Sequence, residues 1–145
     1  MTSTIYKNKS TNWTTLDIPN LKGKTVFITG SNSGLGFYTA KALAEKKAHV
    51  VLACRTLKKA HLAIDQLKSL NPKGKFSPLE LDLADLNNVS EIGSRFSNDF
   101  ENLDLLINNA GIMHPPKTLS AQGFEIQFAV NHLAHMLNIK ITPID

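Results

Sequence analysis

The segment Thr25–Gly36, TVFITGSNSGLG, restricts the fold more than any other part of this chain of 145 residues. Its first five residues are all β-branched or aromatic, which is typical of a strand buried on both faces. Gly30, Gly34 and Gly36 follow directly, and a helical pattern begins at about Leu35. A glycine-rich turn between a buried strand and a helix indicates a parallel α/β sheet, and such a turn can also hold a phosphate.

Each glycine has a physical reason in such a phosphate loop. Gly30 would allow a tight turn at the end of the strand, Gly34 would leave room for a pyrophosphate, and Gly36 would let the helix pack closely on the sheet. The helix N-terminus would supply free N–H groups and the positive end of its dipole. Side-chain donors would come from Ser31, Asn32 and Ser33. The alternative is a glycine-rich turn that binds nothing.

The rest of the chain alternates between short apolar runs and helical patterns. Further strands are expected at 49–54, 76–83 and 103–108. Helices are expected at 35–46, 57–70, 88–100 and 123–140, the third opened by a capping box of Asn88 and Glu91. Apolar strands joined by crossover helices predict the α/β class: a Rossmann-type, doubly wound parallel sheet, here incomplete, with about four strands in the order 3-2-1-4.

The composition fits a globular domain, with 42% hydrophobic and 19% charged residues. The net charge of +4 is scattered rather than gathered in a stripe, so we expect no nucleic-acid partner. We also expect no membrane partner, since no apolar run approaches the roughly 20 residues of a membrane span. The single cysteine, Cys54, suits a reducing compartment and a cytoplasmic location. We expect a polar extension at 1–20 and one domain at 21–145.

The histidines raise the question of a metal site. His132 and His135 are three residues apart on one expected helix, and His114 lies in the loop before it. No cysteine or carboxylate completes a ligand set close to them in the sequence, so we predict no metal. Cys54 is expected to be a small core residue rather than a nucleophile.

Three ordered motifs resemble those of one enzyme family. TGSNSGLG resembles the TGxxxGxG loop of the short-chain dehydrogenase/reductase family, LINNAG at 106–111 is similar to its NNAG motif, and FAVNHLAHML at 128–137 is similar to its helix with a catalytic Asn. The resemblance covers about 13–140. VVLACR together with GFEIQFAVNHLAH is most similar to the retinol-dehydrogenase and protochlorophyllide-reductase side of the family. It implies hydride transfer between a nicotinamide cofactor and a small carbonyl or alcohol substrate.

The resemblance also implies roles for individual residues. Cofactor-binding positions would be Gly30, Ser31, Asn32, Ser33, Gly34, Leu35, Gly36, Arg55, Asp82, Leu83, Asn109, Ala110 and Gly111. Within this set Asp82 and Leu83 would contact the adenine, and 109–111 would line the adenosine ribose. Asn108 would brace the central strands. Asn131 would be the catalytic position, where it would perturb its helix and hold a water of the proton relay.

Arg55 decides which cofactor the sequence favours. An NAD enzyme would place an acidic residue near the end of the second strand, and none occurs between 46 and 57. The guanidinium of Arg55 could instead grip a 2′-phosphate with two hydrogen bonds. We therefore expect NADP, with NAD the less favoured cofactor, while a solvated surface Arg is the plain alternative. Lys58 or Lys59 could assist, although an exposed helix charge is the simpler interpretation.

The catalytic groups of the family are not found in this sequence. They are a Ser and a Tyr-x-x-x-Lys turn, but the two tyrosines, Tyr6 and Tyr38, have no Lys four residues later. We expect an N-terminal cofactor-binding portion that does not turn over alone and whose strand at 103–108 is an open apolar edge. The alternatives are a non-catalytic NADP(H)-binding module or an interaction module, as a homo-oligomer or paired with a full-length relative.

Overall fold

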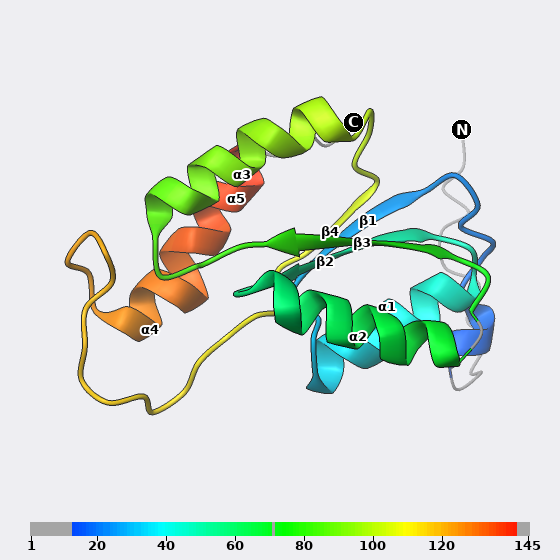
Figure 1. The fold of residues 1–145 in the computed structure, drawn as a ribbon, viewed down its shortest axis with the longest axis horizontal. Helices are drawn as coiled ribbons and strands as arrows, with labels where there is room; N and C mark the ends of the chain where they lie inside the picture. Colours follow the sequence, from blue (N-terminus) through cyan, green and yellow to red (C-terminus); the bar gives the residue numbers. More distant parts are fainter. Residues whose placement is uncertain (1–12, 71, 142–145) are drawn as a thin grey trace, which may run out of the picture.

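The computed structural model describes residues 13–70 and 72–141, which fold into a parallel sheet with helices on both faces (Figure 1). The strand order β3-β2-β1-β4 confirms the prediction from the sequence. The strands are β1 (Thr25–Thr29), β2 (His49–Cys54), β3 (Lys75–Glu80) and β4 (Leu105–Ile107). The first two have the expected bounds, whereas β3 ends before the expected 83 and β4 is shorter than 103–108.

The helices lie in two layers. Figure 1 shows α1 (Gly34–Glu45) and α2 (Leu57–Ser69) on one face of the sheet, and α3 (Leu86–Asp99) with α5 (Ala134–Ile141) on the other. The expected last helix consists of α4 (Ile126–Phe128), a π-helical stretch (Ala129–Leu133) and α5. The helix expected at 123–140 is thus observed from Ile126, and α5 continues through Ile141.

The central strands are buried on both faces because their side chains alternate between two cores. Val26 and Ile28 of β1 pack with α1 and α2, while Phe27 packs with α3 and with the helical segment around Val130. The ring of Phe27 meets that of Phe96 of α3 edge to face, with centroids 5.3 Å apart. This packing fixes β1 at the centre of the molecule and its carboxyl end at the crevice between the layers.

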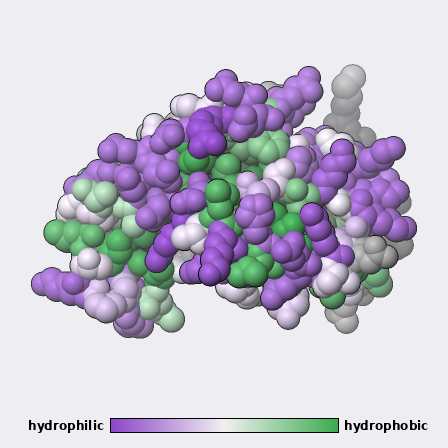
Figure 2. All heavy atoms as spheres, in the orientation of Figure 1, coloured by the Kyte–Doolittle hydropathy of each residue, from purple (hydrophilic) through white to green (hydrophobic). Residues whose placement is uncertain are grey.

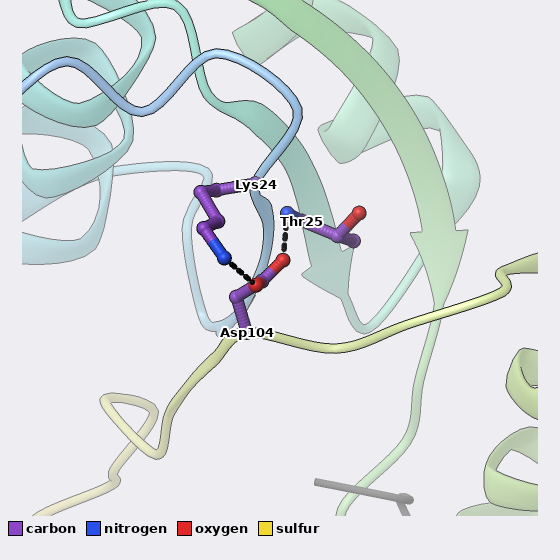
Figure 3. A network of polar contacts seen from close by, with 3 residues as sticks. All are labelled: Lys24, Thr25 and Asp104. Atoms are coloured by element: carbon purple, nitrogen blue, oxygen red, sulfur yellow. Dashed lines mark hydrogen bonds and ion pairs between the residues drawn. The ribbon is translucent and has the colours of Figure 1, made fainter. Parts of the chain in front are cut away.

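Asp104 joins β1 to the chain just before β4 (Figure 3). Its carboxylate accepts a hydrogen bond from Lys24 Nζ at 2.7 Å and one from the backbone N–H of Thr25 at 2.8 Å. The hydrogen bond from Lys24, followed by that from Thr25, lowers the pKa of Asp104. The register of β4 on β1 is thus set by a charged contact as well as by the sheet.

Strand β4 forms an edge of the sheet in the described part of the chain, as expected. It pairs with β1, and Leu105 is 41% exposed. Figure 2 shows further hydrophobic surface at the end of the molecule that holds α4. The exposed large hydrophobic side chains from this region are Met113, Leu119, Phe124 and Phe128.

Two details differ from the sequence expectations or extend them. Helix α3 is not opened by Asn88: it begins at Leu86, with Asp85 as N-cap. Before β1, a short 3₁₀ turn at Thr15–Asp17 precedes Ile18 and Leu21. These two side chains pack against the core between the sheet and helices α1 and α2. Residues 1–12 of the expected polar extension lie outside the described residues, and a domain boundary after residue 20 stays a prediction.

Candidate nucleotide-binding site

A cavity of about 420 Å³ lies at the carboxyl ends of the strands. It is lined by the loop after β1, the ends of β1 and β2, and the segments at 81–84 and 109–112. Its volume falls in the range of small-molecule sites. The sheet grows outward from β1 in opposite directions, to β2 and to β4, and ligands of open α/β sheets bind at such a switch point.

The glycines of the loop are required for two different reasons. A Cβ on Gly36 would come within 2.5 Å of Asn109 Nδ2 and 2.6 Å of the Gly30 carbonyl oxygen, so α1 can approach β1 this closely only with glycine there. Gly30 similarly lies against Ala110. Gly34 has a φ of +54° and nothing within 4 Å of a Cβ, so its backbone conformation requires glycine while the space beside it stays open.

The N-terminus of α1 can accept an anion. Ser33 is the N-cap residue, but its side chain makes no capping hydrogen bond, and no acidic residue lies in the first turn. Asn32, Ser33, Leu35 and Gly36 all line the cavity. The backbone N–H groups of the first turn of α1 therefore lie beside the cavity without a side-chain acceptor, at the positive end of the helix dipole.

Ser31 does not act as expected. It is fully buried, and its hydroxyl donates to the Ile28 carbonyl at 3.0 Å and lies 4.0 Å from Cys54 Sγ. The expectation that its side chain offers a donor to a phosphate is therefore wrong, and any contact with a ligand is left to its backbone. Cys54 is buried as predicted, and burial raises the pKa of its thiol.

Two cations and one carboxylate line the cavity. Arg55 follows β2 directly, and the Thr56 hydroxyl caps α2 by accepting from the backbone N–H of Lys59 at 3.4 Å. Arg55 and Lys59 are exposed cavity residues, whereas Lys58 is not among the cavity residues. Asp82 is the only carboxylate among the described lining residues, and its Oδ1 accepts from the Ala84 N–H at 2.9 Å. The two cations outnumber the single carboxylate, so the part of the cavity beside Arg55 and Lys59 favours an anionic ligand.

Thr29 anchors the segment that forms the opposite wall. Its Oγ1 accepts the backbone N–H groups of Asn109 and Ala110, both at 2.9 Å. The Asn109 side chain donates to the Thr29 carbonyl at 2.9 Å. Asn109 rather than Asn108 therefore braces β1, which corrects the expectation; Asn108 Oδ1 accepts from Asn138 at 3.4 Å.

Asn131 lies in the π-helical stretch, which confirms that the helix is perturbed there. Its Oδ1 accepts the Ile112 N–H at 2.8 Å and its Nδ2 donates to the Ile112 carbonyl at 2.8 Å. Asn131 is not among the cavity residues, but Ile112 and Val130 are. The side chain thus holds the far end of the 109–112 wall, and its role toward a water stays a prediction.

Most of the proposed cofactor positions come together in this cavity. Those that line it are Gly30, Asn32, Ser33, Leu35, Gly36, Arg55, Asp82, Leu83, Asn109, Ala110 and Gly111. Ser31 and Gly34 are not among the lining residues. Lys59, which the sequence offered as a possible aid to Arg55, also lines the cavity, and the residues that the sequence did not propose are Thr29, Ala53, Leu81, Ala84, Ile112 and Val130. Most of them flank proposed positions or end a strand, so the rule that ligands bind at carboxyl ends of strands could have found them.

The histidines have other partners. His132 stacks on Phe128 with ring centroids 5.3 Å apart, and His135 is buried against Thr29. Among residues 13–70 and 72–141, no group of three His, Cys, Asp or Glu side chains could hold a metal ion. Across the same residues, no helix is both long and apolar enough to cross a membrane.

A family model described as short chain dehydrogenase matches residues 24–142. The chain therefore belongs to the short-chain dehydrogenase family, whose members are NAD(P)-dependent oxidoreductases. It is 39% identical to human retinol dehydrogenase 13 over 81% of this chain and 35% of that protein. It is 43% identical to mouse retinol dehydrogenase 14, again over 81% of this chain and 38% of that protein. The chain thus spans little more than a third of these relatives.

Solved structures share the fold. A putative uncharacterized protein from Mycobacterium paratuberculosis superposes with a TM-score of 0.77 at 41% identity, over 91% of this chain and 46% of that one. A metagenomic short-chain oxidoreductase in complex with NADP gives a TM-score of 0.73 at 22% identity, over 85% of this chain and 55% of that one. The second likeness concerns the fold alone.

Proposed function

We propose that this chain is the cofactor-binding portion of an NADP-dependent short-chain dehydrogenase/reductase that acts on a carbonyl or alcohol. The observation that carries the NADP preference is the pair Arg55 and Lys59, which line the cavity beside the end of β2. A 2′-phosphate carries negative charge that an acidic residue there would repel and a guanidinium would bind with two hydrogen bonds.

The other lining residues suit the rest of a dinucleotide. The uncapped first turn of α1 would take the pyrophosphate, with the open space beside Gly34 as its approach. Asp82 and Leu83 would contact the adenine, and 109–111 would line the ribose. When bound, the nicotinamide supplies the hydride chemistry, and the chain's own residues bind and orient the cofactor.

Turnover in the manner of the family would need a Tyr-x-x-x-Lys turn, and this sequence does not contain one. Neither Tyr6 nor Tyr38 is followed by Lys four residues later. We therefore propose that the chain binds NADP(H) without completing a reaction by itself. A non-catalytic NADP(H)-binding module is the second candidate, because the same cavity and its two cations would serve it equally well. Substrate and direction of transfer belong to the whole protein.

The test is a titration of the chain with NADPH and with NADH by calorimetry. We expect NADPH to bind more tightly, and Arg55→Ala to weaken it by about 10- to 100-fold because a charge-assisted hydrogen-bonded contact is lost. NADH affinity should stay within about twofold, since NADH has no 2′-phosphate for Arg55 to contact. Lys58→Ala is the matched control, a neighbouring exposed cation that does not line the cavity. Equal losses for both cofactors, or no binding of either by the unmodified chain, would contradict the proposal.

A further inference from the structure

His135 lies behind the cavity wall rather than in it. It occupies the first turn of α5, and only 7% of its surface is exposed. Its Nε2 is 3.0 Å from Thr29 Oγ1, and its Nδ1 is 3.3 Å from the Asn131 carbonyl oxygen. The position of the proton on this buried ring determines which nitrogen donates a hydrogen bond and which accepts one.

The hydrogen bonds of Thr29 determine the protonation of the ring. A hydroxyl has two lone pairs and one proton, and the N–H groups of Asn109 and Ala110 fill both lone pairs. The proton can go to the Ile107 carbonyl at 3.5 Å or to His135 Nε2 at 3.0 Å. The shorter contact is the better hydrogen bond, so Nε2 accepts and carries no proton.

The second ring nitrogen then carries the proton. With Nε2 as acceptor, neutral His135 holds its hydrogen on Nδ1 and donates it to the Asn131 carbonyl. A carbonyl has two lone pairs, so this bond is compatible with a helical one. Burial lowers the pKa of His135, which favours the neutral ring that this arrangement requires.

We propose that His135, as the Nδ1–H tautomer, is a positioning residue for the cavity wall. By accepting the hydroxyl proton of Thr29, it directs both Thr29 lone pairs to the amides that begin the 109–112 segment. Through its other nitrogen it binds the backbone of Asn131, whose side chain holds Ile112 at the end of that segment. One ring thereby connects both anchors of the wall. The identity of the ligand rests on the proposed function; the positioning does not.

The tautomer can be measured on the unmodified chain. Long-range ¹H–¹⁵N correlation spectra at neutral pH distinguish a protonated from an unprotonated ring nitrogen. We expect Nδ1 of His135 to be protonated and Nε2 to have the shift of an unprotonated acceptor. A ring protonated on Nε2, alone or as the imidazolium, would overturn the proposal, because Thr29 would then face a donor. This result does not depend on any cofactor or on any variant that must fold.

Two variants separate positioning from packing. His135→Gln can place an amide oxygen where Nε2 accepts from Thr29, whereas His135→Asn keeps a donor for the Asn131 carbonyl but is too short to reach Thr29. We expect the Gln variant to retain slow amide hydrogen exchange at Asn109 and Ala110 and NADPH affinity within about threefold. The Asn variant should accelerate that exchange and weaken NADPH binding by about tenfold, the effect of one buried hydrogen bond.

Equal effects of the Gln and Asn variants would overturn the positioning role. In a Thr29→Val background the difference between them should disappear, because the hydroxyl that distinguishes them is gone. A persistent difference there would also count against the proposal. If the unmodified chain binds no NADPH, the proposed function fails, while the tautomer and the exchange rates still decide the role of His135.

Discussion

Replacing Gly36 by alanine tests how tightly α1 is held against β1. The added Cβ would lie 2.6 Å from the Gly30 carbonyl oxygen, and this backbone atom cannot rotate away as a side chain can. To restore an ordinary contact of about 3.4 Å, α1 must retreat by roughly 0.8 Å, and such overpacking typically costs about 1–3 kcal/mol. The displaced Asn109 side chain would also release its hydrogen bond to the Thr29 carbonyl.

Urea unfolding followed by circular dichroism measures this cost, with two glycine-to-alanine controls. Gly34 and Gly123 both have positive φ and nothing within 4 Å of a Cβ, so alanine there adds backbone strain of about 1 kcal/mol without a clash. We expect Gly36→Ala to lose more stability than either control. Gly34→Ala should in addition weaken NADPH binding, and Gly123→Ala should not. A Gly36→Ala variant as stable as the unmodified chain would refute the close approach.

Three further predictions concern the rest of the fold. Lys47 has a φ of +74°, so Lys47→Gly should raise the free energy of unfolding by about 1 kcal/mol in the same urea experiment. Because Lys24 lowers the pKa of Asp104, the charged carboxylate stabilises the fold at every pH above the pKa of an unfolded aspartate, about 3.9. This contribution is lost as the pH falls through the lower pKa of the folded state. In Asp104→Asn the free energy of unfolding should therefore depend less on pH below about pH 4. The chain expressed alone should self-associate through the β4 edge, and Leu105→Lys should shift it toward monomer in light scattering, whereas an unmodified monodisperse monomer would contradict this.

The sheet was predictable because its signals are local. Apolar runs such as that of β2 have sharp polar boundaries, and crossover helices between them leave few topologies open. The start of α3 was not predictable in the same way. Asp85 caps it by accepting from Asn87 N–H at 2.9 Å, while Asn88, the expected cap, accepts instead from Asp82 N–H at 2.8 Å. Two residues could cap this helix by local rules, and a tertiary contact decided between them.

The site was predictable where motif spacing fixes backbone position, and not where side-chain direction matters. The glycines, Arg55 and the 109–111 segment are placed by the strand ends they follow. Ser31 has a residue type suited to phosphate, but its position in the turn directs the hydroxyl into the core. From the sequence, His135 suggests only a metal ligand, because its partner Thr29 lies 106 residues away and no local pattern joins them.

Thr29 shows why a strand end can be structural and functional at once. Its place in a buried strand would suit Val equally well, since both side chains are β-branched and similar in size. Valine, however, would leave the N–H groups of Asn109 and Ala110 and the ring of His135 without their shared partner. The contact with His135 is buried and the two N–H contacts are partly buried, and a buried polar group left unsatisfied costs about 1–3 kcal/mol, more than the gain from one extra methyl group. The hydroxyl is therefore required by the cavity wall that it supports.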